Sequence, residues 1–324
     1  MNEQILRSLT ESRRVVVASH ENPDGDAVSS LLAIGVALEQ QQKIVTFYNA
    51  SQIPAVYRFL PSVGRITSEI NKADAFDTAV ILDCGDLERV GPAAAVMRKI
   101  PVVINIDHHI TNTGFGTVRL VEPAACATAE LVYHLLVRMK TPIDKDLATL
   151  IYTGILTDTG SFRFANTNQA TFAICLEMAE KGVRPHEVAR HVYGTYSLGR
   201  IKLLNLALDS IELAANGKLS IMTVTREMLR QTGTQPEDAD GLIHYARRIE
   251  DVRVAALIQE LQNGSDATKN RHRYHVSLRS DGSVDVSAVA VSYGGGGHQS
   301  AAGFRIEAPL WEVKTQIAQL AEKL

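Results

Sequence analysis

Short runs of β-branched residues alternate with longer amphipathic stretches through the first half of the chain, which limits the folds available to it. Strands are predicted for residues 14–19, 43–48, 78–82 and 102–106. Helices are predicted for residues 27–40, 127–139, 146–156 and 169–180, where apolar residues recur at spacings of three and four. This alternation is typical of βαβ units, so we predict an α/β fold with a doubly wound, mostly parallel sheet.

The character of the sequence changes near residues 182–185, and a chain of 324 residues is long for a single compact core. We predict a first domain over residues 1–185, a helical linker over 186–215 and a smaller α+β domain over 216–324. Within the linker, residues 186–211 are expected to form one continuous helix. In the second domain we predict strands at 220–224, 252–258 and 274–279, an exposed loop at 263–273 and a final helix at 310–323.

Composition excludes several classes of protein. The net charge of −3 and the pI of about 6.4 argue against a broad basic face for long duplex nucleic acid. The polar N-terminus lacks a signal-peptide core, and no apolar run is long enough to span a bilayer, so we expect no membrane partner. Cys84, Cys126 and Cys175 form no CxxC pair, which fits a reducing compartment. We therefore expect a cytoplasmic protein.

Carboxylates and histidines gather where the predicted strands end. They follow the first, third and fourth strands and one later helix, as His20, Asp24, Asp26, Asp83, Asp107, His108, His109 and Asp158. Loops at the carboxyl ends of neighbouring parallel strands converge on one edge of a sheet. Taken singly, Asp24 and Asp26 could be turn or N-cap residues. Taken together, so many carboxylates in one place would repel one another without a cation, so we predict a metal site.

The types of ligand narrow the choice of metal. Mixed carboxylate and imidazole ligands without thiolate suit Mn²⁺, Mg²⁺, Fe²⁺ or Zn²⁺ and exclude a structural zinc site built from cysteines. The number of candidate ligands exceeds what one ion needs. Two ions about 3.5–4 Å apart that share a carboxylate would use them all, and such pairs act on phosphate esters.

A glycine run near the end of the second domain is a candidate ligand site. Gly295, Gly296 and Gly297 are followed directly by His298, and Arg279 lies in a predicted strand upstream. Glycine lets backbone N–H groups approach a phosphate closely, and arginine can donate two hydrogen bonds to one phosphate. A surface loop is the alternative for the glycines alone. With Arg279 and His298 beside them, we predict a substrate-binding site.

These residues lie in motifs that resemble those of the DHH phosphoesterase family. The stretches at 20–30 (HENPDGDAVSS), 82–86 (LDCGD), 107–109 (DHH) and 157–162 (TDTGSF) resemble its four N-terminal motifs in order. The stretches at 276–280, 284–290 and 294–304 resemble the DHHA1 domain. The chain looks most like the branch of nanoRNA oligoribonucleases and pAp phosphatases, where pAp is 3′-phosphoadenosine 5′-phosphate. The resemblance implies a DHH domain at 1–185 and a DHHA1 domain at 216–324.

The resemblance also implies a role for each ligand in a site for two Mn²⁺ ions, with Mg²⁺ or another divalent ion as an alternative. One ion would be held by His20 and Asp24. The second would be held by Asp26, His108 and Asp158, with Asp83 bridging the two ions.

Two neighbouring residues and one departure complete what the resemblance implies. Asp107 would be a ligand or would orient a histidine, and His109 would face the phosphate and assist proton transfer or charge stabilisation. Where the family usually has glycine, this chain has Ser29, beside the ligand loop.

By resemblance, the substrates would be short RNA, cut exonucleolytically to nucleoside monophosphates, or pAp, cleaved to AMP and phosphate. The glycine–histidine motif argues against an inorganic pyrophosphatase, and the chain length argues against a RecJ-like exonuclease. A phosphodiesterase for cyclic or linear dinucleotides and a non-catalytic nucleotide sensor remain alternatives. The resemblance is also compatible with a homodimer, although no residue indicates one.

Overall fold

The computed structural model describes residues 3–70, 72–194, 196–214, 217–261 and 272–320. It divides into two compact units, residues 1–195 and residues 196–324. Each unit has its own sheet and its own buried core.

The first unit is built on a six-stranded sheet in the order β3-β2-β1-β4-β5-β6. Its strands are β1 (Arg14–Ser19), β2 (Ile44–Tyr48), β3 (Ile66–Thr67), β4 (Thr78–Leu82), β5 (Val102–Asp107) and β6 (Val118–Val121). Every neighbouring pair is parallel. The strand order reverses between β1 and β4, which is where ligands bind in doubly wound sheets. The predicted α/β class and doubly wound sheet are confirmed.

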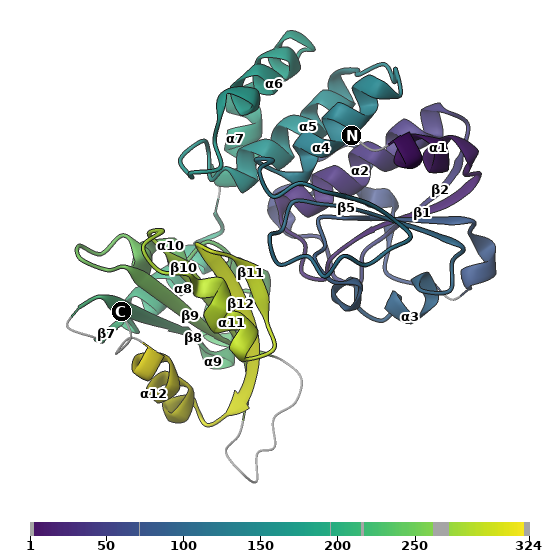
Figure 1. Ribbon diagram of the computed structural model, residues 1–324. Helices are drawn as coiled ribbons and strands as arrows, with labels where there is room; N and C mark the ends of the chain where they lie inside the picture. Colours follow the sequence, from purple (N-terminus) through teal and green to yellow (C-terminus); the bar gives the residue numbers. More distant parts are fainter. Residues whose placement is uncertain (1–2, 71, 195, 215–216, 262–271, 321–324) are drawn as a thin grey trace. The chain divides into compact units, whose positions relative to one another are not determined.

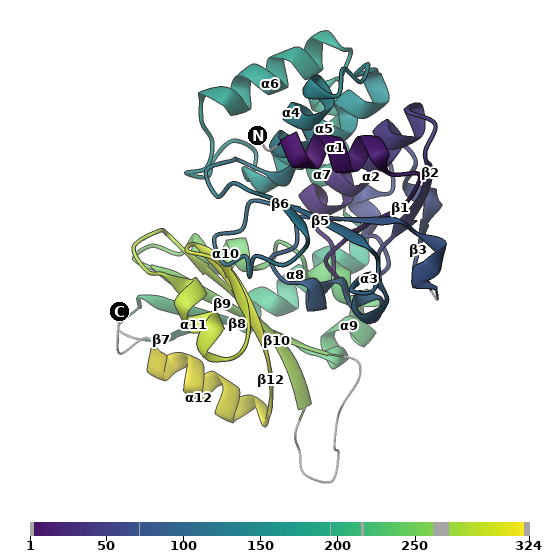
Figure 2. The ribbon, with the colours of Figure 1, turned by 45° about the vertical axis from the view of Figure 1, so that its right-hand side comes forward.

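Helices cover both faces of this sheet. They are α1 (Glu3–Glu11), α2 (Gly25–Gln40), α3 (Ala94–Met97), α4 (Thr128–Arg138), α5 (Lys145–Asp158), α6 (Gln169–Glu180) and α7 (Pro185–Tyr193). Helices α2, α4 and α5 lie on one side of the sheet and α3 lies on the other (Figures 1 and 2). Val15 and Val17 of β1 pack in the core with the first three helices, whereas Val16 and Ala18 pack in the core with α3. Burial on both faces explains why these strands read as continuous apolar runs.

The second unit contains a mixed sheet in the order β11-β12-β10-β9-β8-β7. Its strands are β7 (Glu212–Ala214), β8 (Leu219–Val224), β9 (Val254–Glu260), β10 (His272–Ser280), β11 (Gly296–His298) and β12 (Ala301–Ala308). Its helices are α8 (Leu198–Asp209), α9 (Arg226–Thr232), α10 (Ile243–Arg247), α11 (Val286–Ser292) and α12 (Leu310–Leu320). Helices α11 and α12 pack on one face, and α8, α9 and α10 pack on the other (Figure 1).

The prediction of one continuous helix over residues 186–211 is wrong. Helix α7 ends at Tyr193 with Gly194 as its C-cap, and a new helix, α8, begins at Leu198. The side chain of Ser197 caps α8 by accepting a hydrogen bond of 3.0 Å from the backbone N–H of Arg200. Each helix keeps its own apolar spacing, so periodicity alone hid the break.

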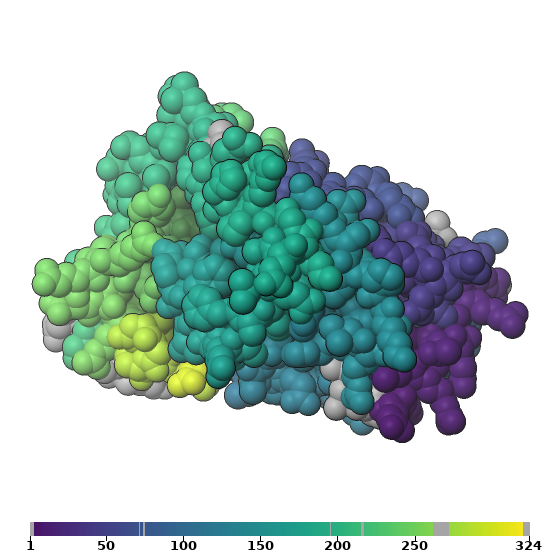
Figure 3. Space-filling view, turned by 90° about the horizontal axis from the view of Figure 1, so that it is seen from above, coloured from purple at the N-terminus to yellow at the C-terminus, as the bar shows by residue number. Residues whose placement is uncertain are grey.

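Smaller differences concern the second unit and the N-terminus. Of the predicted loop at 263–273, residues 263–271 lie outside the described residues, and the last two belong to β10. The predicted end of the final helix at 323 also lies outside them. Helix α1 was not predicted. It buries Ile5 and Leu9, and its atoms are the darkest purple in Figure 3, at the rim of the view. Among the described helices, none is long and apolar enough to cross a membrane.

Candidate metal centre

The loop between β1 and α2 and the first turn of α2 present three of the predicted ligands. His20 follows β1, and Asp24 is the N-cap of α2, where its Oδ1 accepts a hydrogen bond of 3.0 Å from the N–H of Ala27. Asp26 lies in the first turn of α2 and is buried. Asp24 therefore caps α2 and also lies at the candidate metal site. A carboxylate at a helix N-terminus is favoured by the positive end of the helix dipole.

Asp83 lies at the centre of the site. It follows β4, is 2% exposed, and has a backbone φ of +52°, a left-handed conformation that costs energy for any residue other than glycine. Its backbone N–H donates a hydrogen bond of 2.9 Å to the carbonyl of Ile106 in β5, which holds it in this conformation. Strained residues of this kind cluster at functional sites.

The two carboxylate oxygens of Asp83 face different histidines. Its Oδ2 lies 3.7 Å from Nε2 of His20, and its Oδ1 lies 3.7 Å from Nε2 of His108. Nε2 of His108 also lies 3.5 Å from Oδ2 of Asp158, at the end of α5. Ligand atoms about 2.0–2.2 Å from one ion lie about 3–4 Å from each other, so these spacings fit shared ions.

Among the described residues of the first unit, potential ligand atoms form three groups in which all atoms lie within 4.8 Å of one another. The groups are His20 with Asp24 and Asp83, Asp26 with Asp83 and His108, and Asp83 with Asp107 and His109. Asp83 belongs to all three. The structure therefore brings together every metal-site residue that the sequence analysis selected in this unit, with Asp158 joined through His108.

The charges of this cluster are poorly balanced without a cation. Burial, reinforced by Asp83 and Asp158, raises the pKa of Asp26 well above its usual value. Burial also raises the pKa of Asp158 to about 7, with Asp24 and Asp83 adding to the shift. Burial lowers the pKa of His108, but Asp158, Asp83 and Asp26 outweigh it and raise that pKa to about 10. Crowded carboxylates that resist ionisation are a typical signature of a cation site.

No thiolate takes part. Cys84 directly follows Asp83, but its Sγ lies 3.0 Å from the carbonyl of Asp86, and burial raises the pKa of this thiol to about 12. The donors are therefore imidazole nitrogens and carboxylate oxygens. This set fits Mn²⁺, Mg²⁺, Fe²⁺ or Zn²⁺.

Asp107 contacts His109. Its Oδ1 lies 2.7 Å from Nδ1 of His109, and its Oδ2 accepts a hydrogen bond of 2.6 Å from Nδ2 of Asn112. Asn112 also donates to Oδ1 of Asn105 at 2.9 Å. Burial raises the pKa of Asp107, but the hydrogen bond and charge of His109 lower it overall. Sequence analysis missed Asn112, which only its place three residues after the DHH triplet could have suggested.

Sequence analysis also missed Thr128, the first residue of α4. Its backbone N–H donates a hydrogen bond of 2.6 Å to Oδ2 of Asp26, and its hydroxyl donates one of 2.9 Å to Oδ1 of Asp83. A signal was present: Ala127 at the N-cap position cannot cap the helix with its side chain. A missing local cap implies that the helix N-terminus is satisfied from elsewhere.

Ser29 carries a buried hydroxyl beside the site. The residue is 0% exposed, and among the described residues its Oγ has no hydrogen-bond partner. Ser30 next to it donates to Oδ1 of Asp26 at 3.0 Å. The hydroxyl of Ser29 therefore adds a desolvation cost that a side chain without a polar group would not.

Ser29→Ala is expected to raise the free energy of unfolding of the metal-free protein by about 1 kcal/mol, because it removes an unpaired buried hydroxyl. The melting temperature would rise by about 2–4 °C, measured by calorimetry. Ser30→Ala provides the contrast, since it removes a donor from Asp26 and should not stabilise the protein. A lower melting temperature for Ser29→Ala would mean that the hydroxyl is paired.

In the second unit, Arg279 and His298 lie on one row of the sheet. Both are paired in register with Ala301 of β12, Arg279 from β10 and His298 from β11, so their side chains leave the same face. The glycines have a structural reason as well. A Cβ on Gly295 would lie 2.1 Å from the carbonyl oxygen of Gly303, and Gly297 has a φ of +143°. Close pairing with β12 therefore requires glycine at these two positions.

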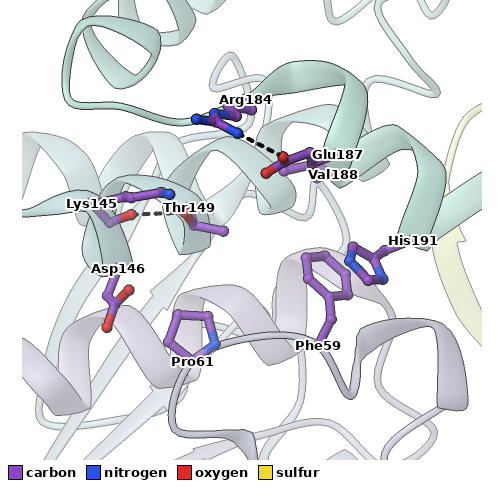
Figure 4. Close-up of a pocket in the computed structure, with 9 residues that line it drawn as sticks. All are labelled: Phe59, Pro61, Lys145, Asp146, Thr149, Arg184, Glu187, Val188 and His191. Atoms are coloured by element: carbon purple, nitrogen blue, oxygen red, sulfur yellow. Dashed lines mark hydrogen bonds and ion pairs between the residues drawn. The ribbon is translucent and has the colours of Figure 1, made fainter.

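A separate hollow of about 230 Å³ lies on the first unit (Figure 4). The rings of Phe59 and His191 stack along it, with centroids 4.4 Å apart, and Lys145 at the start of α5 lines it. Asp158 is at the other end of this 14-residue helix, about 20 Å away. The hollow is therefore distinct from the metal centre.

The chain is similar to known proteins along its length. A model described as the DHH family, N-terminal domain, matches residues 14–155, and a DHHA1 domain model matches residues 216–324. The bifunctional oligoribonuclease and PAP phosphatase NrnA of Thermus thermophilus is 32% identical over 292 residues, which covers 89% of this chain and 83% of that protein. The protein of the same name from Bacillus subtilis is 25% identical, covering 94% and 93%.

A solved structure supports the same relationship. The crystal structure of an exopolyphosphatase-related protein from Bacteroides fragilis matches with a TM-score of 0.87 at 26% identity, covering 99% of this chain and 95% of that one. The resemblance inferred from the motifs is thus confirmed. The chain belongs to the DHH family of phosphoesterases, metal-dependent hydrolases, and joins a DHH domain to a DHHA1 domain.

Proposed function

We propose that this protein is a two-metal phosphoesterase that shortens very short RNA to nucleoside monophosphates and cleaves pAp to AMP and phosphate. The observation that carries the proposal is the position of Asp83, whose two oxygens face His20 on one side and His108 on the other. One carboxylate between two sets of ligands suits a pair of ions that share a bridge. The names of the relatives from Thermus thermophilus and Bacillus subtilis supply the two substrate classes.

The proposed ligand set divides into two subsites. His20 and Asp24 form the first subsite, and Asp26, His108 and Asp158 form the second, with Asp83 common to both. We propose Mn²⁺ as the preferred ion, since oxygen and imidazole donors suit it. Two divalent ions held by these residues would supply a nucleophile near neutral pH and would neutralise charge on the phosphate oxygens.

His109 and Asp107 are proposed to act together in proton transfer to the leaving oxygen. Asp107 is fully buried and has one oxygen on Nδ1 of His109 and the other on Asn112, which supports an orienting role rather than metal ligation. An ionised carboxylate can only accept, so the Nδ1 proton of His109 points at Asp107. The carboxylate holds the imidazole in one orientation and favours its protonated form, so His109 can donate a proton or hydrogen bond to the leaving oxygen.

In the second unit, Arg279 and His298 are proposed to bind the part of the substrate that is not cut. They leave the same face of the sheet, and an arginine can donate two parallel hydrogen bonds to a phosphate. Gly295, Gly296 and Gly297 carry no side chain, so we propose that a phosphate can come close to the backbone at these residues.

The test uses the full-length chain, stripped of metal and then reloaded with Mn²⁺. We expect stepwise shortening of a 5′-labelled RNA pentamer and release of AMP from pAp in the reloaded sample only, because the ions supply both nucleophile and charge neutralisation. Pyrophosphate, offered as a third substrate, should remain intact. Products are measured by gel and by liquid chromatography.

Three outcomes would contradict the proposal. Hydrolysis of pyrophosphate alone would mean that the second unit has been misinterpreted. Cleavage restricted to cyclic or linear dinucleotides would establish that alternative. Binding of the metal and of nucleotides without any turnover would indicate that the protein is a non-catalytic nucleotide sensor.

A further inference from the structure

One short segment, residues 125–129 between β6 and the first turn of α4, touches the proposed second subsite on several sides. His108 is held at its Nδ1, which lies 3.1 Å from the carbonyl oxygen of Ala125. A carbonyl can only accept, so Nδ1 of the neutral ring carries the proton and Nε2 points toward Asp83 and Asp158. This hydrogen bond fixes the tautomer that a metal ligand needs.

Asp26 is anchored by the N-terminus of α4. Its Oδ2 accepts a hydrogen bond of 2.6 Å from the N–H of Thr128, and its Oδ1 accepts one of 2.9 Å from the N–H of Ala129. Ala127 cannot cap this helix, so a carboxylate from α2, more than 100 residues earlier in the chain, takes the place of the cap. The helix end and the carboxylate therefore position each other.

Asp83 is held by the same residue. The hydroxyl of Thr128, which is 0% exposed, donates a hydrogen bond of 2.9 Å to Oδ1 of Asp83. Oδ1 is the oxygen that faces His108, whereas Oδ2 faces His20. Thr128 therefore acts on the half of the bridging carboxylate that belongs to the second subsite.

Asp158 is linked to the segment through Asn166. Nδ2 of Asn166 donates to the carbonyl of Cys126 at 2.8 Å and lies 3.3 Å from Oδ2 of Asp158. The N–H of Cys126 in turn donates to Oε2 of Glu130 at 2.7 Å, which ties the segment to the body of α4. All four proposed contributors to the second subsite are thus connected to five consecutive residues.

The two residues that belong to the first subsite alone, His20 and Asp24, are held by other parts of the chain. Nδ1 of His20 lies 2.9 Å from the carbonyl of Glu21, and Asn49 donates to the carbonyl of His20 at 2.9 Å. Asp24 accepts from Ala27 within its own helix. None of these hydrogen bonds involves residues 125–129.

We propose that Thr128 is the positioning residue of the second subsite, and that the two subsites therefore owe their metal affinities to separate parts of the chain. This inference rests on the proposed two-metal function. It predicts that one isosteric substitution, Thr128→Val, weakens one ion and spares the other. Loss of a residue that orients metal ligands typically costs about 10–100-fold in metal affinity.

The experiment measures Mn²⁺ binding to the metal-free full-length protein by isothermal titration calorimetry, with electron paramagnetic resonance reporting whether two ions are coupled. The wild type is expected to bind two coupled ions. Thr128→Val should bind one ion with unchanged affinity and a second about 10–100-fold more weakly, and the coupled signal should be lost at low Mn²⁺. Thr128→Ser keeps the hydroxyl and should restore both.

The matched control is Thr153→Val. Thr153 is also 0% exposed on a neighbouring helix of the same unit, and its hydroxyl donates to the carbonyl of Thr149 rather than to a carboxylate. Thr153→Val exchanges a hydroxyl for a methyl group, as Thr128→Val does. Because the lost hydrogen bond does not involve a proposed ligand, this variant should still bind both ions. Two double variants identify which subsite is weakened. Added to His20→Ala, in which the second subsite remains, Thr128→Val should lower the affinity for Mn²⁺. Added to His108→Ala, in which the first subsite remains, it should have little effect.

The outcomes separate this inference from the proposed function. If the wild type binds fewer than two ions, the two-metal function fails. If the wild type binds two ions but Thr128→Val behaves like Thr153→Val, or weakens both ions equally, the inference is overturned. If circular dichroism shows that Thr128→Val does not fold, Asn166→Ala is tested instead. This variant removes the link between Asp158 and the segment, and it should weaken the binding of the same single ion.

Discussion

Asp83→Asn is expected to lower kcat for the RNA pentamer and for pAp by at least about 10³-fold, with the fold retained. A single preorganised hydrogen-bond donor is typically worth about 10²–10³-fold, and Asp83 is proposed to hold both ions. The amide keeps the shape of the side chain but loses the charge and one of the two acceptor oxygens. Steady-state kinetics with saturating Mn²⁺ measure the loss, and circular dichroism checks the fold.

The control for this variant is Glu88→Gln on the following turn. It makes the same change of charge on a carboxylate that is 66% exposed and paired with Arg98, and it should leave kcat within about twofold, since exposed ion pairs contribute little. Metal-induced stabilisation provides a second measurement: the rise in melting temperature on adding Mn²⁺ should shrink in Asp83→Asn. Turnover close to that of the wild type would refute the bridging role.

Gly154→Ala is expected to destabilise the first unit by about 1–3 kcal/mol and to weaken metal binding at the same time. Gly154 lies in α5 where this helix crosses α4 and α2. A Cβ at this position would lie 2.6 Å from Cβ of Ala129 and 2.8 Å from Oδ1 of Asp26. In a helix, alanine is more favourable than glycine by up to about 1 kcal/mol. This preference would raise the stability of the variant, so a net loss of stability must come from the clash.

Thermal unfolding with and without Mn²⁺ measures both effects. Gly64→Ala serves as the control, because a Cβ there would meet nothing within 4 Å. The metal-dependent rise in melting temperature should be smaller in Gly154→Ala than in the wild type, since Asp26 must shift to make room. An unchanged or higher stability with full metal affinity would mean that α5 can move away at no cost.

Much of the first unit could be predicted because its signals are local. The strands at 14–19 and 78–82 were predicted with the bounds that the structure gives them, because burial on both faces produces uninterrupted apolar runs. The candidate ligand residues could be selected because parallel strands place their carboxyl ends at one edge. The break at Gly194 is local too, but the apolar spacing on both sides concealed it.

The supporting residues could not be predicted for a different reason. Thr128 meets Asp83 across 45 residues of sequence and Asp26 across 102. No periodicity or motif records which helix N-terminus will meet which carboxylate, since that depends on the packing of α2, α4 and α5. Asn112 was likewise an ordinary loop residue until the fold placed it on Asp107.

The spread of the proposed ligands along the chain has a consequence for biosynthesis. His20 and Asp24 emerge from the ribosome early, but Asp158 and the start of α4 follow more than 100 residues later. A nascent chain that ends before α4 exposes the first carboxylates without the helix end that anchors Asp26. Metal loading should therefore be a late event, completed only when nearly the whole first unit has been synthesised and folded. A protein truncated between β6 and α4 would carry the DHH triplet but lack Thr128, Ala129 and Asp158 of the proposed second subsite.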